Sequence, residues 1–209
     1  MNIIIKRLSM EHLPLVDAFI CTEEKEDLKE YSSNIRRRII RHSKDMEDFL
    51  KKEALSDQEK GLNTTHLFID TDTNKIIAYI SLCSDSIRLE FSEKENMNLS
   101  YTTVPSIKIA RLAVANEYKH HGVGKSLIQF AAYIGKKIQN ECGIVFITLD
   151  CYEHRLSFYE SIGFSKNLIQ PNQREYDSPI SMRLGLDNYL QKIADELIEN
   201  EDNEEKTEE

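Results

Sequence analysis

The sequence contains few of the residues that build disulfide-rich, membrane-spanning or metal-binding proteins. It has no tryptophan, four prolines, seven glycines and four cysteines in 209 residues. Without C-x-x-C spacing, a disulfide framework or a zinc site is not expected, and free thiols in a cytoplasmic protein are the simpler interpretation. No run approaches the roughly 20 apolar residues of a membrane span, and residues 1–7 lack the apolar core of a signal peptide. The cysteines are Cys21, Cys83, Cys142 and Cys151.

The net charge of −9 is concentrated at the C-terminal end. Residues 193–209 hold nine Asp or Glu and one Lys, which gives −8 and leaves −1 for residues 1–192. This distribution predicts one domain over residues 1–186, a C-terminal helix over 187–200 and an acidic disordered tail over 201–209. A charged helical insertion is predicted at 23–44, and it contains a basic cluster. The cluster is interpreted either as a solvated helix face or as a contact for a phosphate backbone. Its members are Arg36, Arg37, Arg38, Arg41, His42 and Lys44.

The most informative segment is a glycine-containing turn at residues 119–126. It follows the apolar run 107–114 and precedes an amphipathic segment, an order typical of a strand, a turn and a helix. Glycines let the backbone approach a ligand closely, and the first N–H groups of a helix have no intrahelical partner. With the helix dipole, they predict a site for a phosphate or pyrophosphate. A tight turn without a ligand is the alternative.

Two common phosphate-binding motifs fit this turn poorly. A P-loop requires a glycine at position 119, which is Lys119, and a dinucleotide fingerprint requires one at position 127, which is Leu127. The turn instead resembles the Q/R-x-x-G-x-G/A motif of the GNAT acetyltransferases, which binds the pyrophosphate of coenzyme A. Lys119 stands where that family has Gln or Arg. The resemblance implies that coenzyme A contacts Lys119, His120, His121, Gly122, Val123, Gly124, Lys125 and Ser126.

A second segment, residues 158–164, supports this resemblance because it matches the F-Y-x-x-x-G-F signature that closes the GNAT core. Leu156, Tyr159 and Ile162 recur at helical spacing, and Gly163 stands where a left-handed C-cap belongs. One interpretation of Tyr159 is a core tyrosine that anchors the helix. The resemblance implies instead that it is the general acid that protonates the coenzyme A thiolate. It also implies that the pantetheine arm and the acetyl carbonyl are bound by the backbone of Leu112, Ala113 and Val114.

The order of elements between these motifs predicts an α/β (α+β) fold. Leu127, Ala131, Ile134 and Ile138 share one helix face, and residues 144–149 form a buried strand. The resemblance implies the GNAT fold, with a mixed twisted sheet of six to seven strands flanked by helices and an added C-terminal helix.

Elsewhere the pattern predicts strands at 3–8 and 179–184 and a hairpin over 65–84. Ser9 and Asp45 are candidate N-caps, the latter for a helix through Glu59. The polar stretch 92–103 is expected to be a loop.

A narrower resemblance covers residues 49–164. The segments 49–54, 61–68, 77–82 and 109–114 resemble the GNAT toxins that acetylate the amino group of aminoacyl-tRNA. This resemblance implies tRNA as a partner and a separate antitoxin chain. The modest basic surface and the acidic tail count against it.

The strand before the glycine turn contains no carboxylate, although many GNAT enzymes place a base there. An α-amine has an ordinary pKa of about 8 and a lysine side chain about 10.4, so only the α-amine is substantially neutral at physiological pH without a base. This absence favours an α-amine or another amine of low pKa as the acceptor. Asp150 and Glu153 are the alternative bases.

The sequence therefore predicts an acetyl-CoA-dependent N-acetyltransferase without a metal. The acceptor is left open between a small-molecule amine, a protein N-terminus and aminoacyl-tRNA. A homodimer is an option, because the C-terminal helix offers an apolar stripe. A non-catalytic acyl-CoA-binding module is the alternative from another class, and Tyr159 argues against it because binding needs no general acid.

Overall fold

The computed structural model describes residues 2–170 and 178–205, and the side chains of residues 2–170 and 178–199. Seven strands form one sheet in the order β1-β2-β3-β4-β5-β7-β6. This mixed sheet with flanking helices confirms the predicted fold class. The strands are β1 (Ile3–Arg7), β2 (Thr64–Asp70), β3 (Lys75–Arg88), β4 (Thr103–Val114), β5 (Phe146–Cys151), β6 (Ser165–Lys166) and β7 (Ile180–Gly185).

The helices include the predicted one after the glycine turn and an extra helix at the C-terminal end. That helix begins at Leu186 and continues to Glu205, past the expected end at residue 200. Residues 206–209 of the expected acidic tail lie outside the described residues. The helices are α1 (Leu13–Asp17), α2 (Ser33–Lys52), α3 (Ala54–Glu59), α4 (Phe91–Asn96), α5 (Val123–Gln139), α6 (Leu156–Ile162) and α7 (Leu186–Glu205), with short 3-10 helices η1 (Met10–His12), η2 (Glu26–Leu28), η3 (Asn116–Tyr118) and η4 (Glu153–Arg155).

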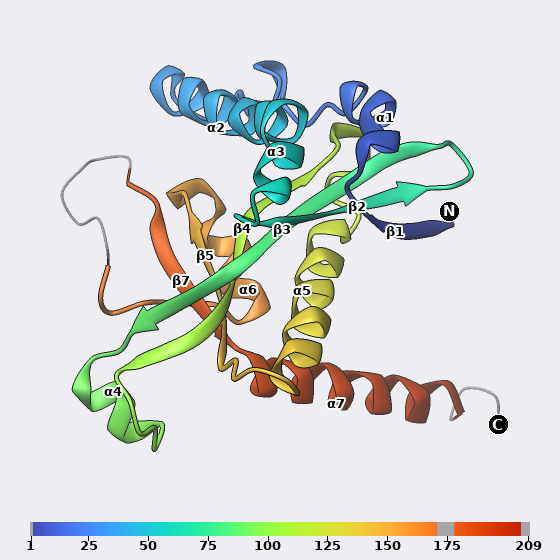
Figure 1. Cartoon of the computed structure of the whole chain (residues 1–209). Coiled ribbons are helices and arrows are strands. Elements are labelled where there is room, and N and C mark those ends of the chain that lie inside the picture. Colours follow the sequence, from blue (N-terminus) through green and yellow to red (C-terminus); the bar gives the residue numbers. More distant parts are fainter. Residues whose placement is uncertain (1, 171–177, 206–209) are drawn as a thin grey trace. The chain divides into compact units, whose positions relative to one another are not determined.

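The chain divides into two compact units, of which the first comprises Met1–Ser84 and Lys108–Phe130. In this unit β1 pairs with β2 and β2 with β3, both antiparallel. Helix α2 contacts α1 and α3, and α3 contacts β2 (Figure 1).

Three aromatic side chains pack together in the otherwise mostly aliphatic core of the first unit. The ring of the fully buried Tyr79 lies 5.6 Å from that of Phe19 and 6.3 Å from that of Phe49. Its hydroxyl donates a hydrogen bond of 2.6 Å to the carbonyl of Met46 in α2, so the buried polar group is satisfied. Cys21 lies in the same core, and burial raises the pKa of its thiol to about 12.

The second unit comprises Asp85–Ile107 and Ala131–Glu209. Here β7 pairs antiparallel with β5 and β6. Arg183 on β7 is only 8% exposed and is satisfied by an ion pair with Glu93 and a 3.1 Å hydrogen bond to Oδ1 of Asn167. Because Glu93 also accepts the backbone N–H of Glu90 at the start of α4, this buried pair attaches α4 to β7.

Two element predictions are wrong. The stretch 92–103 is not all loop, because Glu90 and Glu93 form a reciprocal capping box that starts α4. Asp45 is not an N-cap, because it lies inside α2, whose N-cap is Ser32. In both cases the capping side chain, rather than the polarity of the segment, determines where the helix begins.

Gly163 ends α6 in the left-handed region, with φ of 117°, which confirms the predicted C-cap. We expect Gly163→Ala to lower the free energy of unfolding by about 1–3 kcal/mol, because an L-residue is strained at this φ. An added Cβ would meet only ordinary contact, 3.4 Å from Leu184, so the cost comes from the backbone. Urea denaturation measures it.

Gly185→Ala is the matched control for that substitution. Its Cβ would also meet only ordinary contacts, at 3.6 Å or more, and its φ is not positive. Equal losses of stability in the two variants would contradict the assignment of the cost to the left-handed backbone.

Candidate functional site

The predicted phosphate-binding turn lies in the first unit, between β4 and α5. β4 ends at Val114, η3 follows over Asn116–Tyr118, and α5 begins at Val123. Ala113 and Ala115 pack into the core of this unit, and the N–H of Ala115 donates a 2.8 Å hydrogen bond to the carbonyl of Ile77. The end of the strand, and with it the start of the turn, is therefore fixed by burial and by hydrogen bonding.

The backbone of the turn adopts the left-handed conformation twice. His120 has φ of 64° and Gly122 has φ of 79°. Left-handed residues that alternate with other conformations can bring successive N–H groups into the concave arrangement that binds anions in other proteins. Among the described residues, the five N–H groups from His120 to Gly124 have no hydrogen-bond acceptor. The side chains of His120 and His121 are exposed, so the concavity opens to solvent.

The helical hydrogen bonds of α5 begin only after this concavity. The N–H groups of Lys125 and Ser126 donate to the carbonyl of Gly122, at 2.9 and 3.3 Å. The preceding N–H groups are thus left at the positive end of the helix dipole, where an anion is stabilised.

The helix predicted from Leu127, Ala131, Ile134 and Ile138 is α5, and these four positions differ in burial. Leu127 and Ala131 are buried, Ile134 is half-buried, and Ile138 is 38% exposed. The buried positions of α5 recur in neighbouring pairs separated by about one helical turn. They are Leu127, Ile128, Ala131, Ala132 and Gly135.

The side chain of Lys119 is directed toward the first unit's own backbone and carboxylates. Its ammonium forms a 2.9 Å ion pair with Glu23 and donates a 3.0 Å hydrogen bond to the carbonyl of Cys21. The Lys119 side chain is 19% exposed and that of Glu23 is 12% exposed. The positive charge next to the turn is therefore already neutralised inside the unit.

The residues predicted to bind the pantetheine arm are the last of β4. Ala113 is buried, whereas Leu112 and Val114 are half-buried. They lie within ten residues of the turn along the chain and in the same unit. The first unit therefore contains all the residues predicted to hold the cofactor.

Tyr159, the predicted general acid, belongs to the second unit. It lies in the middle of α6, and its ring contacts those of Phe158 and Phe164 at centroid distances of 5.0 and 5.6 Å. Burial, and to a lesser degree the nearby Cys151, raises the pKa of Tyr159 well above its ordinary value. Among the described residues no hydrogen bond to its hydroxyl is found. The phenol therefore stays protonated, and its proton is not engaged elsewhere in that part of the chain.

The carboxylates proposed as alternative bases also lie in the second unit. Asp150 is exposed near the end of β5, and Glu153 is exposed in η4. Cys151 lies between these two residues in the sequence, and burial together with the nearby Asp150 raises the pKa of its thiol to about 11. Cys151 is thus a neutral thiol at physiological pH and not a nucleophile.

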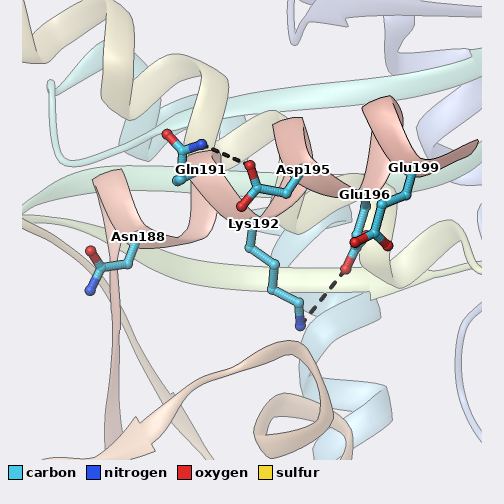
Figure 2. A pocket seen from close by; sticks show the side chains of 6 residues that line it. All are labelled: Asn188, Gln191, Lys192, Asp195, Glu196 and Glu199. Carbon is cyan, nitrogen blue, oxygen red and sulfur yellow. Dashed lines mark hydrogen bonds and ion pairs between the residues drawn. The ribbon is translucent and has the colours of Figure 1, made fainter. Parts of the chain in front are cut away.

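A shallow surface pocket lies along α7, and its lining residues are distant in sequence from Tyr159 and from the turn at 119–126. Figure 2 shows that its lining comes from this helix alone, with side chains joined by hydrogen bonding between Gln191 and Asp195 and by ion pairing between Lys192 and Glu196. A site usually gathers groups from several elements, so this pocket is a solvated helix surface.

Two further properties concern the described residues only. They contain no group of three His, Cys, Asp or Glu side chains arranged to hold a metal ion. They also contain no helix that is long and apolar enough to cross a membrane.

Residues 63–166 match the family model of the acetyltransferase (GNAT) domain, whereas no curated protein sequence matches the chain. Two solved structures with similar folds are AtaT complexed with acetyl-methionyl-tRNAfMet and a tyrosine-to-phenylalanine variant of KacT. Each is 16% identical in sequence to this chain and superposes on it with a TM-score of 0.68. The matches cover 92% and 91% of this chain, respectively, and 99% of each of the two structures. A KacTA–DNA complex has a TM-score of 0.60 at 19% identity, covering 93% of this chain and 99% of its own. At such identities these structures show a shared fold.

Gly122→Ala tests whether the turn is an anion site. Among the described residues nothing lies within 4 Å of the added Cβ, so the change acts through the backbone by disfavouring the left-handed conformation. We expect coenzyme A to bind about tenfold more weakly, as a strain of 1–3 kcal/mol allows. Isothermal titration calorimetry measures the dissociation constant.

Gly61→Ala is the matched control in the same unit. Gly61 has φ of 74° and equally open surroundings among the described residues, so the substitution adds similar strain away from the turn. If both variants bind coenzyme A as the wild type does, the turn does not hold it.

Proposed function

We propose that this chain, a member of the GNAT acetyltransferase family, transfers the acetyl group of acetyl-CoA to a primary amine by direct attack in a ternary complex. The observation that carries the proposal is the concavity of N–H groups between His120 and Gly124. Its converging donors and the dipole of α5 suit the pyrophosphate of coenzyme A.

In this proposal the turn and the end of β4 hold the acetyl-CoA. The N–H groups of residues 120–124 bind the pyrophosphate, and Lys125 and Ser126 lie on the exposed first turn of α5 beside it. The backbone of residues 112–114 binds the pantetheine arm and polarises the acetyl carbonyl. These contacts place the thioester carbon where an amine can attack it.

Tyr159 supplies the proton in the proposed reaction. The amine nitrogen bonds to the thioester carbon, the carbon–sulfur bond breaks, and the departing thiolate takes the phenolic proton. The attacking amine loses its proton to solvent or to a base, and the phenolate left on Tyr159 takes a proton back from solvent, which restores the acid and balances the charge. The raised pKa of Tyr159 keeps the acid protonated through the neutral and mildly alkaline range.

The lack of a carboxylate on β4 bears on the acceptor. A site without a base there suits an amine that is already partly neutral, which an α-amino group is and a lysine side chain is not. We therefore propose an α-amine or another low-pKa amine as the acceptor, with Asp150 or Glu153 as the base if one is needed.

A second candidate is the acetylation of aminoacyl-tRNA, which would make the chain a toxin-like enzyme. It is favoured by the fold shared with AtaT, solved with acetyl-methionyl-tRNAfMet, and by the missing base. The exposed Arg37 and Arg41 of α2 offer charge for an RNA backbone. In this case a separate neutralising chain is expected, as in the AtaT complex with the antitoxin AtaR, and a homodimer is a further option.

The acceptor is identified by following thiol release from acetyl-CoA with charged total tRNA, free amino acids and polyamines as parallel acceptors. We expect release with an acceptor that presents an α-amine. Release with charged tRNA alone would establish the toxin-like function. Release with polyamines alone would contradict the argument from the missing base.

Tyr159→Phe removes only the hydroxyl and keeps the ring contacts with Phe158 and Phe164. We expect kcat to fall by roughly 10²–10⁴-fold, the usual contribution of a general acid, while the dissociation constant of acetyl-CoA stays unchanged. Steady-state thiol release and calorimetry measure the two quantities.

Tyr133→Phe, at a tyrosine that is 56% exposed on α5, is the control and should leave both quantities unchanged. Unchanged turnover in Tyr159→Phe would exclude the acid role. Tight coenzyme A binding by a wild-type chain that transfers no acetyl group to any acceptor would favour a non-catalytic acyl-CoA-binding module.

A further inference from the structure

Residues 20–23, called here the bridging segment, connect α2 with the residues that precede the anion-binding turn. All the groups involved lie in the first unit. The contacts fall into two sets, one toward α2 and one toward η3 and Lys119, and each set contains a largely buried ion pair.

On the side of α2, one carboxylate holds the segment. Oε2 of Glu47 accepts hydrogen bonds from the N–H groups of Cys21 and Thr22 and from the hydroxyl of Thr22, at 3.1, 3.3 and 2.8 Å. Oε1 of Glu47 pairs with Lys51 at 2.8 Å. Burial alone would raise the pKa of Glu47, but the hydrogen bond from Lys51 and then those from Thr22 and Cys21 lower it below its ordinary value. The group is therefore a carboxylate at neutral pH.

On the other side, the segment holds the entry to the turn. The carbonyls of Ile20 and Thr22 accept hydrogen bonds from the backbone and side-chain N–H of Asn116, at 3.0 and 2.8 Å. The ammonium of Lys119 binds the carbonyl of Cys21 and the carboxylate of Glu23. Lys119 is the residue immediately before His120, where the left-handed backbone begins.

The conformation of His120 needs such support. A residue with a Cβ costs roughly 1–2 kcal/mol in the left-handed region, and that conformation persists only where the surroundings impose it. The anchored neighbours Asn116 and Lys119 impose it from one side, and the start of α5 imposes it from the other.

We propose that Glu23, Glu47 and Lys119 are positioning residues that preset the His120–Gly122 backbone for the pyrophosphate of acetyl-CoA. This inference rests on the proposed function. It gives Lys119 a role different from direct phosphate contact, because its ammonium is bound to Glu23 and to a carbonyl rather than directed to solvent.

Direct phosphate contact and positioning of the turn, the two possible roles of Lys119, predict opposite changes in coenzyme A affinity when Glu23 is replaced. If the ammonium contacted the phosphate, Glu23→Gln would release it and coenzyme A would bind more tightly. If Lys119 positions the turn, Glu23→Gln loosens it and coenzyme A binds more weakly. The loss should be about tenfold, as for breaking one partner of a largely buried pair.

The experiment measures the dissociation constant of coenzyme A by calorimetry for the wild type, Glu23→Gln, Glu47→Gln and Lys119→Met. We expect weaker binding in all three variants, and a larger loss of kcat/KM with acetyl-CoA than with acetyl-pantetheine, which lacks the pyrophosphate. A merely structural role would lower turnover equally with both donors. In the Glu23→Gln background, Lys119→Met should cause little further loss, because the two residues act as one unit.

Glu117→Gln is the matched control, since Glu117 belongs to η3 and forms an exposed ion pair with Lys75 at 3.1 Å. It should bind coenzyme A as the wild type does, because exposed pairs contribute little. If the wild type binds coenzyme A and Glu23→Gln binds it equally well or more tightly, the positioning role is overturned. Absence of coenzyme A binding in the wild type would instead overturn the proposed function.

Discussion

The first unit is organised around a set of backbone N–H groups that have no acceptor in the described part of the chain. These exposed donors are satisfied by water, and an anion that binds them replaces that water at the positive end of the helix dipole. To present them together, β4 must end at Val114, the backbone must turn left-handed at His120 and Gly122, and α5 must begin at Val123. The buried core beneath Ala113 and Ala115 and the bridging segment both restrict this geometry. A loss of either would let the donors diverge.

Features that depend on local sequence could be predicted, because a few neighbouring residues determine them. Gly163 ends α6 and Gly122 permits the turn for the same reason, a backbone conformation that disfavours a side chain. The N-caps were less reliable, since Asp45 has a suitable side chain but lies inside α2. The helical periodicity of α5 did not fix burial along its whole length, because Leu127 and Ala131 are buried whereas Ile138, on the same predicted face, is exposed.

Features that depend on tertiary contacts could not be predicted. Cys21 and Lys119 are 98 residues apart along the chain, so no spacing indicates that they meet. The motif places Lys119 beside a phosphate, whereas the fold neutralises its charge with Glu23. The left-handed His120 was not predicted either, because positive φ is uncommon for any residue other than glycine, although histidine is among the side chains enriched there. For Tyr159 the motif indicated the chemistry, but the surroundings that raise its pKa come from the fold.

The burial of the cysteines has a practical consequence for labelling the protein. Of the four thiols, Cys21 and Cys151 are buried, Cys83 is half-buried and Cys142 is exposed. Maleimides and related reagents attack the thiolate, which the raised pKa values of Cys21 and Cys151 suppress at neutral pH. Cys142, just beyond the end of α5, therefore offers a natural attachment point for a fluorophore or spin label. Such a probe would report on the second unit without an engineered cysteine.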